Sequence, residues 1–170
     1  ALRLYLRARG YGLAALELRY RGIRSDLERS PVEAAARIGR RDLPTLYWTA
    51  AAWGLAISIG KDHPDIVADI DAVRALMNRA LALDENYDGG AVHEAMIVLE
   101  SLPAMMGGSP ARARTHFDRA VDLSHGLRAG PFVTLAESVA VPAQDRAEFR
   151  RLLEQAIAID PDKNPESRLE

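Results

Sequence analysis

The apolar positions of this chain recur at the three- and four-residue intervals of α-helices, and no stretch shows the two-residue alternation of a half-buried strand. Helix starts are marked by a polar residue followed by proline, as at Ser30-Pro31 and Ser109-Pro110. Glu33 completes a capping box with Ser30. Paired glycines at 89–90 and 107–108 mark connections between helices. The pattern predicts an all-α fold of about eight helices.

Three of the expected helices share one C-terminal pattern, found at residues 79–84, 119–124 and 155–160, at intervals of 40 and 36 residues. Their apolar positions at i, i+4 and i+7 end on an alanine, which lets a second helix approach closely, as in the second helix of a tetratricopeptide repeat. The matching positions are Val73, Met77 and Ala80; Ala113, Phe117 and Ala120; and Phe149, Leu153 and Ala156. We expect these sets to form one face of each helix.

The helices are expected to form antiparallel pairs within a single domain that spans residues 1–170. The pairs are 2–19 with 31–40, 43–59 with 64–83, 89–102 with 109–124, and 130–141 with 143–159. This arrangement would be an irregular tetratricopeptide-like array. A helical bundle without superhelical stacking remains the alternative.

The segment 43–60 carries no charge over 18 positions, close to the length of a membrane span. Pro44, Thr45, Thr49 and Ser58 dilute it, and its strongly apolar part, 46–59, is too short to cross a bilayer. A helix that is apolar nearly all round is better explained by burial among other helices.

The charge is unevenly distributed. The whole chain has a formal net charge of −2, which argues against a general nucleic-acid-binding protein. Residues 1–41 contain ten arginines and four acidic residues, so this segment carries +6 and the remainder −8. The basic segment could meet a phosphate or anionic lipid surface. We favour solvated helix faces or pairing with acidic residues of the same chain.

Catalytic motifs are not supported by their spacing. The chain has no cysteine, which excludes disulfides, thiolate metal ligands and thiol nucleophiles. His93-Glu94 resembles the start of a zinc-protease motif, but Ile97 stands where the second histidine ligand is required. Gly107-Gly108 lacks the lysine and the preceding strand of a phosphate loop. We predict no catalytic residue, metal or cofactor; a residual enzymatic arrangement would need His93 beside Glu94 or Glu137.

Aromatic residues gather around two helix starts. The candidate ligand-binding residues are Tyr47, Trp48, Trp53, Tyr87 and His93. They could simply pack between repeats, or they could line an apolar pocket or channel, since each offers a ring face and a hydrogen-bonding group.

Several segments, in this order, resemble the T-component family associated with tripartite ATP-independent periplasmic (TRAP) transporters, from Gly10 to Leu169. They are Asp42-Leu43-Pro44, Leu46-Tyr47-Trp48, Trp53-Gly54, Tyr87-Asp88-Gly89-Gly90-Ala91-Val92-His93, Gly107-Gly108-Ser109 and Leu123-Ser124, followed by Val133, Leu135, Ala136 and Glu137 and by Phe149, Leu152 and Leu153. The order and spacing carry the resemblance, because no single motif is distinctive.

The resemblance implies an all-helical, tetratricopeptide-like periplasmic lipoprotein that partners the solute-binding protein of a TRAP transporter. It also implies a homo-oligomer and a small hydrophobic or organic-acid ligand. The family's N-terminal lipid-bearing cysteine and closing helix are missing, so we expect truncation at both ends and membrane attachment only through a lipid anchor absent from this chain. A general peptide-binding tetratricopeptide adaptor is the alternative function.

Overall fold

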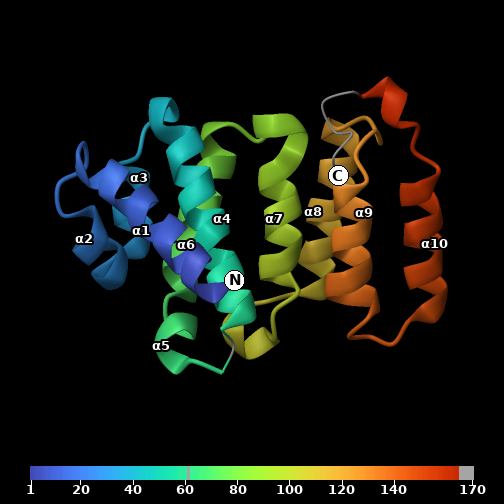
Figure 1. Cartoon of the computed structure of the whole chain (residues 1–170), viewed down its shortest axis with the longest axis horizontal. Coiled ribbons are helices and arrows are strands. Elements are labelled where there is room, and N and C mark those ends of the chain that lie inside the picture. The colour runs from blue at the N-terminus through green and yellow to red at the C-terminus, as the bar shows by residue number, and fades with distance from the viewer. Residues whose placement is uncertain (61, 165–170) are drawn as a thin grey trace. The chain divides into compact units, whose positions relative to one another are not determined.

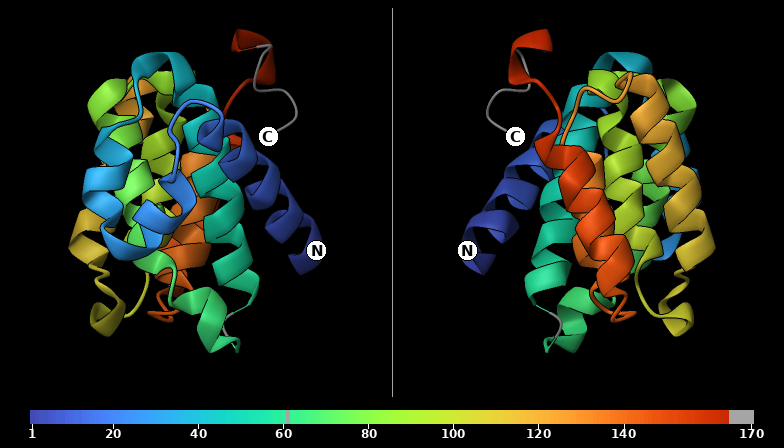
Figure 2. Two further views of the ribbon diagram at one scale, coloured as in Figure 1. Left: turned by 90° about the vertical axis from the view of Figure 1, so that its left-hand side faces the viewer. Right: turned by 90° about the vertical axis from the view of Figure 1, so that its right-hand side faces the viewer.

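The computed structural model describes residues 1–60 and 62–164, and within these residues the fold is entirely helical (Figures 1 and 2). The end of the family-like stretch, up to Leu169, lies outside the described residues. The chain divides into two compact units, unit 1 (Ala1–Glu85) and unit 2 (from Asn86 onward), each described by itself below. The all-α prediction is confirmed, and the single domain stays a prediction.

Within its described residues, unit 1 contains six α-helices and a short 3₁₀ turn. They are α1 (Leu2–Glu17), α2 (Ile23–Arg29), α3 (Pro31–Ala36), η1 (Arg40–Asp42), α4 (Leu43–Ile59), α5 (Pro64–Val67) and α6 (Ile70–Leu83). Unit 2 is built from η2 (Tyr87–Gly90), α7 (Ala91–Glu100), η3 (Ala104–Met106), α8 (Pro110–Leu123), α9 (Gly130–Leu135), the π-turn η4 (Ala136–Ala140), α10 (Arg146–Ile157) and η5 (Pro161–Lys163).

Three of the expected helix pairs are present. Helix α4 packs against α6, α7 against α8, and α9 against α10. The predicted first pair is wrong: α1 packs chiefly against α4, whereas α3 packs against α2 and α6. Helix α3 spans 6 residues and cannot cover the 16-residue α1, whereas α4 has 17 residues. The unpredicted helix α2 also contacts α3.

The repeated small and apolar positions lie against the cores, as expected. Val73, Met77 and Ala80 are buried in unit 1, and Ala113 and Ala120 are buried in unit 2. The corresponding positions of α10 are partly buried against the core of unit 2, which includes the residues Ile97, Phe132, Leu135 and Leu152. Tetratricopeptide-like stacking remains a prediction, because the pairing of neighbouring helices does not by itself define a superhelix.

Two helix starts behave differently from each other. Ser109 caps α8 as predicted, its side chain accepting a hydrogen bond from the backbone N–H of Arg112 at 3.4 Å. Ser30 precedes α3 as predicted but makes no capping hydrogen bond with its side chain, because it also ends α2 and has a φ of −146° and a ψ of 68°. The proposed capping box at Ser30 and Glu33 is therefore not formed.

Helix α4 meets neighbours on several sides, as its apolar sequence predicts. It packs against α1, α6, α5 and η1. Trp48, Leu55 and Ile59 nevertheless remain exposed. Among the described residues, no helix combines the length and apolar character that crossing a bilayer requires.

Candidate functional site

The five candidate ligand-binding residues fall in both units. Tyr47, Trp48 and Trp53 lie on α4 in unit 1, whereas Tyr87 lies in η2 and His93 lies on α7 in unit 2. The environment of each group is therefore built up separately.

Trp53 is part of a three-residue contact within unit 1. Its side chain is buried, and its indole N–H donates to Asp69 Oδ2 at 3.1 Å. Arg9 Nη1 donates to the same oxygen at 3.1 Å, and the Arg9 guanidinium carbon lies 4.9 Å from the centroid of the Trp53 ring. This contact joins α1, α4 and the residue that precedes α6. The indole N–H of Trp53 is therefore used in a contact that stabilises the fold.

The neighbouring aromatic pair on α4 divides between core and surface. Tyr47 is buried, but the side chain of Trp48 is 62% exposed. Their rings meet edge to face, with centroids 5.1 Å apart. Within this group, Trp48 therefore offers a ring surface that is open to solvent, and the ring of the buried Tyr47 packs against it.

Tyr87 begins a connection whose backbone is held in an unusual conformation. Three successive residues, Asp88, Gly89 and Gly90, have φ values of 47°, 59° and 94°. The Arg128 guanidinium donates to the Asp88 carbonyl oxygen and also lies 3.6 Å from its carboxylate. A Cβ on Gly90 would lie 3.2 Å from the Cβ of Leu123, so glycine is required there for both conformation and space. The half-buried Tyr87 is thereby fixed at the start of α7.

His93 is buried and meets a second histidine. Its Nδ1 lies 2.8 Å from His116 Nδ1, and the two ring centroids are 5.1 Å apart. This contact requires a hydrogen on only one of the two nitrogens. Burial, then the nearby His93, lowers the pKa of His116 from its usual 6.5; Glu100 opposes this effect and Arg112 adds to it. The pair joins α7 to α8.

Two carboxylates on α7 have partners of their own. Glu94 accepts a hydrogen bond from Thr134 Oγ1 of α9 at 3.1 Å. Glu100 is buried and accepts one from Arg112 Nε of α8 at 2.7 Å. Glu94 therefore links α7 to α9, and Glu100 links α7 to α8.

The connection at residues 107–110 is a turn, as the sequence indicates. Arg112 also donates from Nη2 to the Gly107 carbonyl oxygen at 2.5 Å, and the Ser109 N–H donates to the Glu100 carbonyl oxygen at 2.7 Å. A Cβ at Gly108 would lie 1.8 Å from the Leu102 carbonyl oxygen. The second glycine is therefore needed for the close approach of two backbone segments.

Comparison with known proteins identifies the family. The sequence profile described as TRAP transporter T-component matches residues 1–170. The chain belongs to the TRAP transporter T-component family. An uncharacterized protein of Treponema pallidum (strain Nichols) is 29% identical to the T-component chain over 177 residues, which cover 99% of this chain and 54% of that relative. The chain thus spans about half the length of this curated relative.

The family-like segment at Asp42 has a structural role in this T-component chain. Tyr20 donates from its hydroxyl to Asp42 Oδ2 at 2.8 Å, and Arg19 Nη1 lies 3.2 Å from Asp42 Oδ1. The Tyr20 hydroxyl in turn accepts from the Gly39 N–H at 3.0 Å. The start of α4 is therefore attached to the segment that follows α1.

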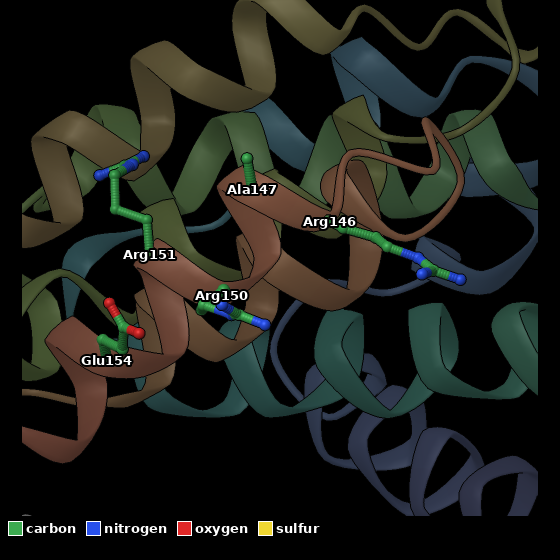
Figure 3. Close-up of a pocket in the computed structure, with 5 residues that line it drawn as sticks. All are labelled: Arg146, Ala147, Arg150, Arg151 and Glu154. Atoms are coloured by element: carbon green, nitrogen blue, oxygen red, sulfur yellow. The ribbon is translucent and has the colours of Figure 1, made fainter.

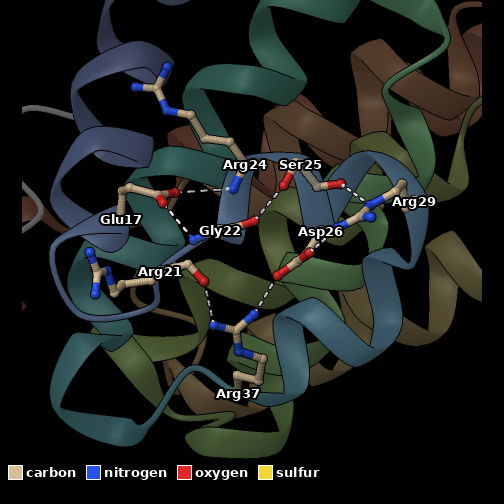
Figure 4. Close-up of polar contacts among 8 residues, drawn as sticks. All are labelled: Glu17, Arg21, Gly22, Arg24, Ser25, Asp26, Arg29 and Arg37. Atoms are coloured by element: carbon tan, nitrogen blue, oxygen red, sulfur yellow. Dashed lines mark hydrogen bonds and ion pairs between the residues drawn. The ribbon is translucent and has the colours of Figure 1, made fainter.

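Several arginines of the basic N-terminal segment pair within unit 1, as we favoured. Arg37 and Arg29 both bind the Asp26 carboxylate, at 2.6 and 2.7 Å (Figure 4). The two guanidinium groups lower the pKa of Asp26. Arg40 pairs with Asp84 at 2.6 Å. Much of the local positive charge is thus neutralised inside the unit, which weakens the case for a phosphate-binding surface.

Helix α10 carries cationic side chains that the sequence analysis did not single out. A shallow surface recess is lined by Arg146, Ala147, Arg150, Arg151 and Glu154, all on this helix (Figure 3). Arg151 donates to Gln155 Oε1 at 2.8 Å, and the labelled side chains spread along the helix without converging on one point. The arrangement is that of an exposed helix face, since the side chains do not converge as they would around a ligand.

Sequence spacing gives no signal for the partners that complete these contacts. Arg9 and Asp69 lie 60 residues apart, and His93 and His116 lie 23 apart. Helix packing brings each partner into contact. The sequence pattern pointed to Trp53 and His93, and only the fold shows that they meet Asp69 and His116.

Proposed function

We propose that this T-component chain is part of a non-enzymatic periplasmic scaffold that docks the solute-binding protein of a TRAP transporter. The observation that carries the proposal is the family match over residues 1–170. Antiparallel helix pairs support it physically, because they present broad side faces built from rigid elements. Such faces suit the docking of another folded protein.

The docking is tested with the solute-binding protein of the same transporter. The purified chain and that protein are mixed and analysed by size-exclusion chromatography with light scattering, with an unrelated periplasmic binding protein as the control. We expect a complex with the cognate protein alone. A typical transient complex has a dissociation constant of roughly 10⁻⁶ M. Separate elution of the two proteins at concentrations up to about 100 times this value would overturn the proposal.

We further propose that the scaffold binds a small hydrophobic or organic-acid ligand through the aromatic residues Tyr47, Trp48, Trp53, Tyr87 and His93. The open ring of Trp48 and the fixed position of Tyr87 support this role. Trp53 and His93 already use polar atoms in contacts with Asp69 and His116, so their contribution would be apolar ring surface.

Tyr87 provides the cleanest test of ligand binding, because the positive φ values and the Arg128 contact that characterise its loop belong to other residues. Tyr87→Ala should lower the amount of ligand that mass spectrometry finds in an organic extract of the purified protein. Tyr5→Ala is the matched control, since Tyr5 is also half-buried and lies outside the proposed set. Equal ligand content in both variants and the parent protein would remove Tyr87 from the set.

We also propose that the full-length protein is periplasmic and held at a membrane by a lipid anchor. The test is cell fractionation of the full-length protein together with metabolic labelling by a fatty acid. Labelled protein in the membrane fraction, released into the periplasmic fraction when the acceptor cysteine is replaced, is the expected result. Unlabelled protein in the cytoplasm would contradict it.

A further inference from the structure

Helices α7 and α8 are joined by two histidine rings that meet through one nitrogen each. His93 Nδ1 lies 2.8 Å from His116 Nδ1, which is a hydrogen-bond distance, and the two ring planes are tilted by 43°. One of these nitrogens must carry a hydrogen, and the other must present its lone pair. A protonated ring carries hydrogens on both nitrogens. The contact therefore needs at least one neutral ring.

The surroundings of both rings disfavour a positive charge. His93 is buried in the first turn of α7, where the helix dipole repels a cation. His116 is half-buried on α8, and Arg112 and Arg119 lie one turn away on either side of it. Burial and then the nearby His93 lower the pKa of His116, an effect that Glu100 opposes and Arg112 reinforces. The neutral pair is therefore the form that this environment favours.

The acidic groups of the neighbouring elements are engaged elsewhere. Helix α9 contains no titratable residue. On α7, Glu94 accepts a hydrogen bond from α9, and in η2, Asp88 lies beside Arg128. On α10, Glu148 pairs with an arginine of α8. Glu100 is therefore the carboxylate that acts on the histidine pair within the described part of unit 2, and it already binds an arginine of α8.

The pair lies beside the connection that positions Tyr87. His93 is the third residue of α7, and η2 directly precedes this helix and packs against both α7 and α8. Residues 88–90 of η2 all have positive φ values, a conformation that persists only where surrounding contacts hold it. Separating the first turn of α7 from α8 would remove part of that support. The histidine contact and the position of Tyr87 are therefore coupled.

We infer that His93 and His116 form a proton-sensitive latch, which holds the first turn of α7 against α8 at neutral pH and opens when both rings are protonated. Opening turns the half-buried ring of His116 toward solvent and frees the first turn of α7 together with Tyr87. Acid then weakens ligand binding at Tyr87, a consequence that rests on the proposed ligand-binding function. The latch itself does not depend on that function.

The imidazole nitrogens report the state of the latch directly by nuclear magnetic resonance. At pH 7.5, long-range ¹H–¹⁵N spectra should show a hydrogen on the Nδ1 of one ring and a lone pair on the Nδ1 of the other. The chain is then titrated to pH 4.5. Because the pKa of His116 is lowered, we expect both rings to become protonated below about pH 6.5. The backbone amide signals of residues 87–94 should shift in the same transition.

Three variants separate the latch from other effects of acid. His116→Gln should keep the turn closed at low pH, because its amide can accept a hydrogen bond from a protonated His93 as well as donate one to a neutral ring. His116→Lys places a permanent cation on α8 and should give the open signals of residues 87–94 already at pH 7.5. His125→Gln, at an exposed histidine of unit 2, is the control and should open like the parent chain. Circular dichroism checks that each variant keeps its helicity.

Two results would overturn the latch. The first is protonation of both rings without any shift of the amide signals of residues 87–94, and the second is opening of His116→Gln at the same pH as the parent chain.

Mass spectrometry of ligand extracted after incubation at pH 7.5 and 5.5 tests the consequence for binding. The parent chain should lose ligand in acid, and His116→Gln should retain it. If residues 87–94 open and the ligand content is unchanged, the proposed role of Tyr87 in ligand binding fails and the latch stands. If Tyr87→Ala loses ligand at pH 7.5 while residues 87–94 of the parent chain stay closed in acid, the latch fails and the ligand proposal stands.

Discussion

Trp53 donates its indole N–H to Asp69, while Arg9 covers its ring and binds the same carboxylate oxygen. At this scale, residue type alone identified an aromatic side chain suited to a ligand, but not its partners. His93 is similar, because its ring meets His116 and not an acid placed by sequence proximity. The sequence shows the chemical type of each side chain, but the contacts that each side chain makes depend on neighbours from distant segments.

Replacing Trp53 by phenylalanine keeps an aromatic ring in the core but removes the donor to Asp69. We expect Trp53→Phe to lower the free energy of unfolding by about 1 kcal/mol, since Asp69 is partly exposed and keeps its bond to Arg9. Urea denaturation followed by circular dichroism measures the change. Unaltered stability would mean that the indole N–H bond contributes nothing net.

Two glycines on α1 illustrate what packing adds to helix propensity. Gly12 faces α4, where a Cβ would lie 2.0 Å from Thr49 Oγ1, while a Cβ on Gly10 would meet nothing within 4 Å. Glycine is a poor helix former at either position, and the structure separates the two. The close approach at Gly12 lies where α1 packs against α4, a pairing that the sequence did not predict.

The two glycines provide a matched pair of variants. Gly12→Ala should destabilise the protein by about 2 kcal/mol, because the helices must move apart or Thr49 must change rotamer. Gly10→Ala should stabilise it by up to about 1 kcal/mol, through higher helix propensity alone. Thermal or urea unfolding of the two proteins checks the sign of each change. Equal effects would show that α1 and α4 do not approach closely at Gly12.

The α7–α8 pair should be sensitive to pH through His116. Its pKa is lowered in the folded protein, so below about pH 6.5 the unfolded chain binds more protons and stability falls as the pH falls. His116→Gln should reduce this dependence. Urea unfolding of both proteins at pH 7.5 and 5.5 makes the comparison, and an identical loss of stability in the variant would assign the dependence to other groups.

At the scale of the whole molecule, family membership is established and the domain count is still a prediction. Two compact units each contain a core, whereas the sequence pattern predicts one domain over residues 1–170. One domain requires that the units unfold together. The two possibilities differ in whether destabilising the core of one unit also destabilises the other unit, and this can be measured.

Leu152→Ala tests this prediction. Leu152 is fully buried in the core of unit 2, and removing its side chain should cost about 2–5 kcal/mol. If residues 1–170 form one cooperative domain, the variant should lose hydrogen-exchange protection in the buried helices of both units. Lost protection confined to α7–α10 would show two independent domains.

The sequence by itself determined the helical class, most helix positions and the family, because apolar periodicity, proline and glycine placement, and motif order are local properties of the chain. It also favoured solvation or internal pairing for the arginines of residues 1–41, and several of them do pair. Only the tertiary structure decided that α1 pairs with α4, that Trp53 binds Asp69 with Arg9, and that His93 meets His116. Those contacts join residues 16 to 60 positions apart, and their geometry follows from which helix faces pack together.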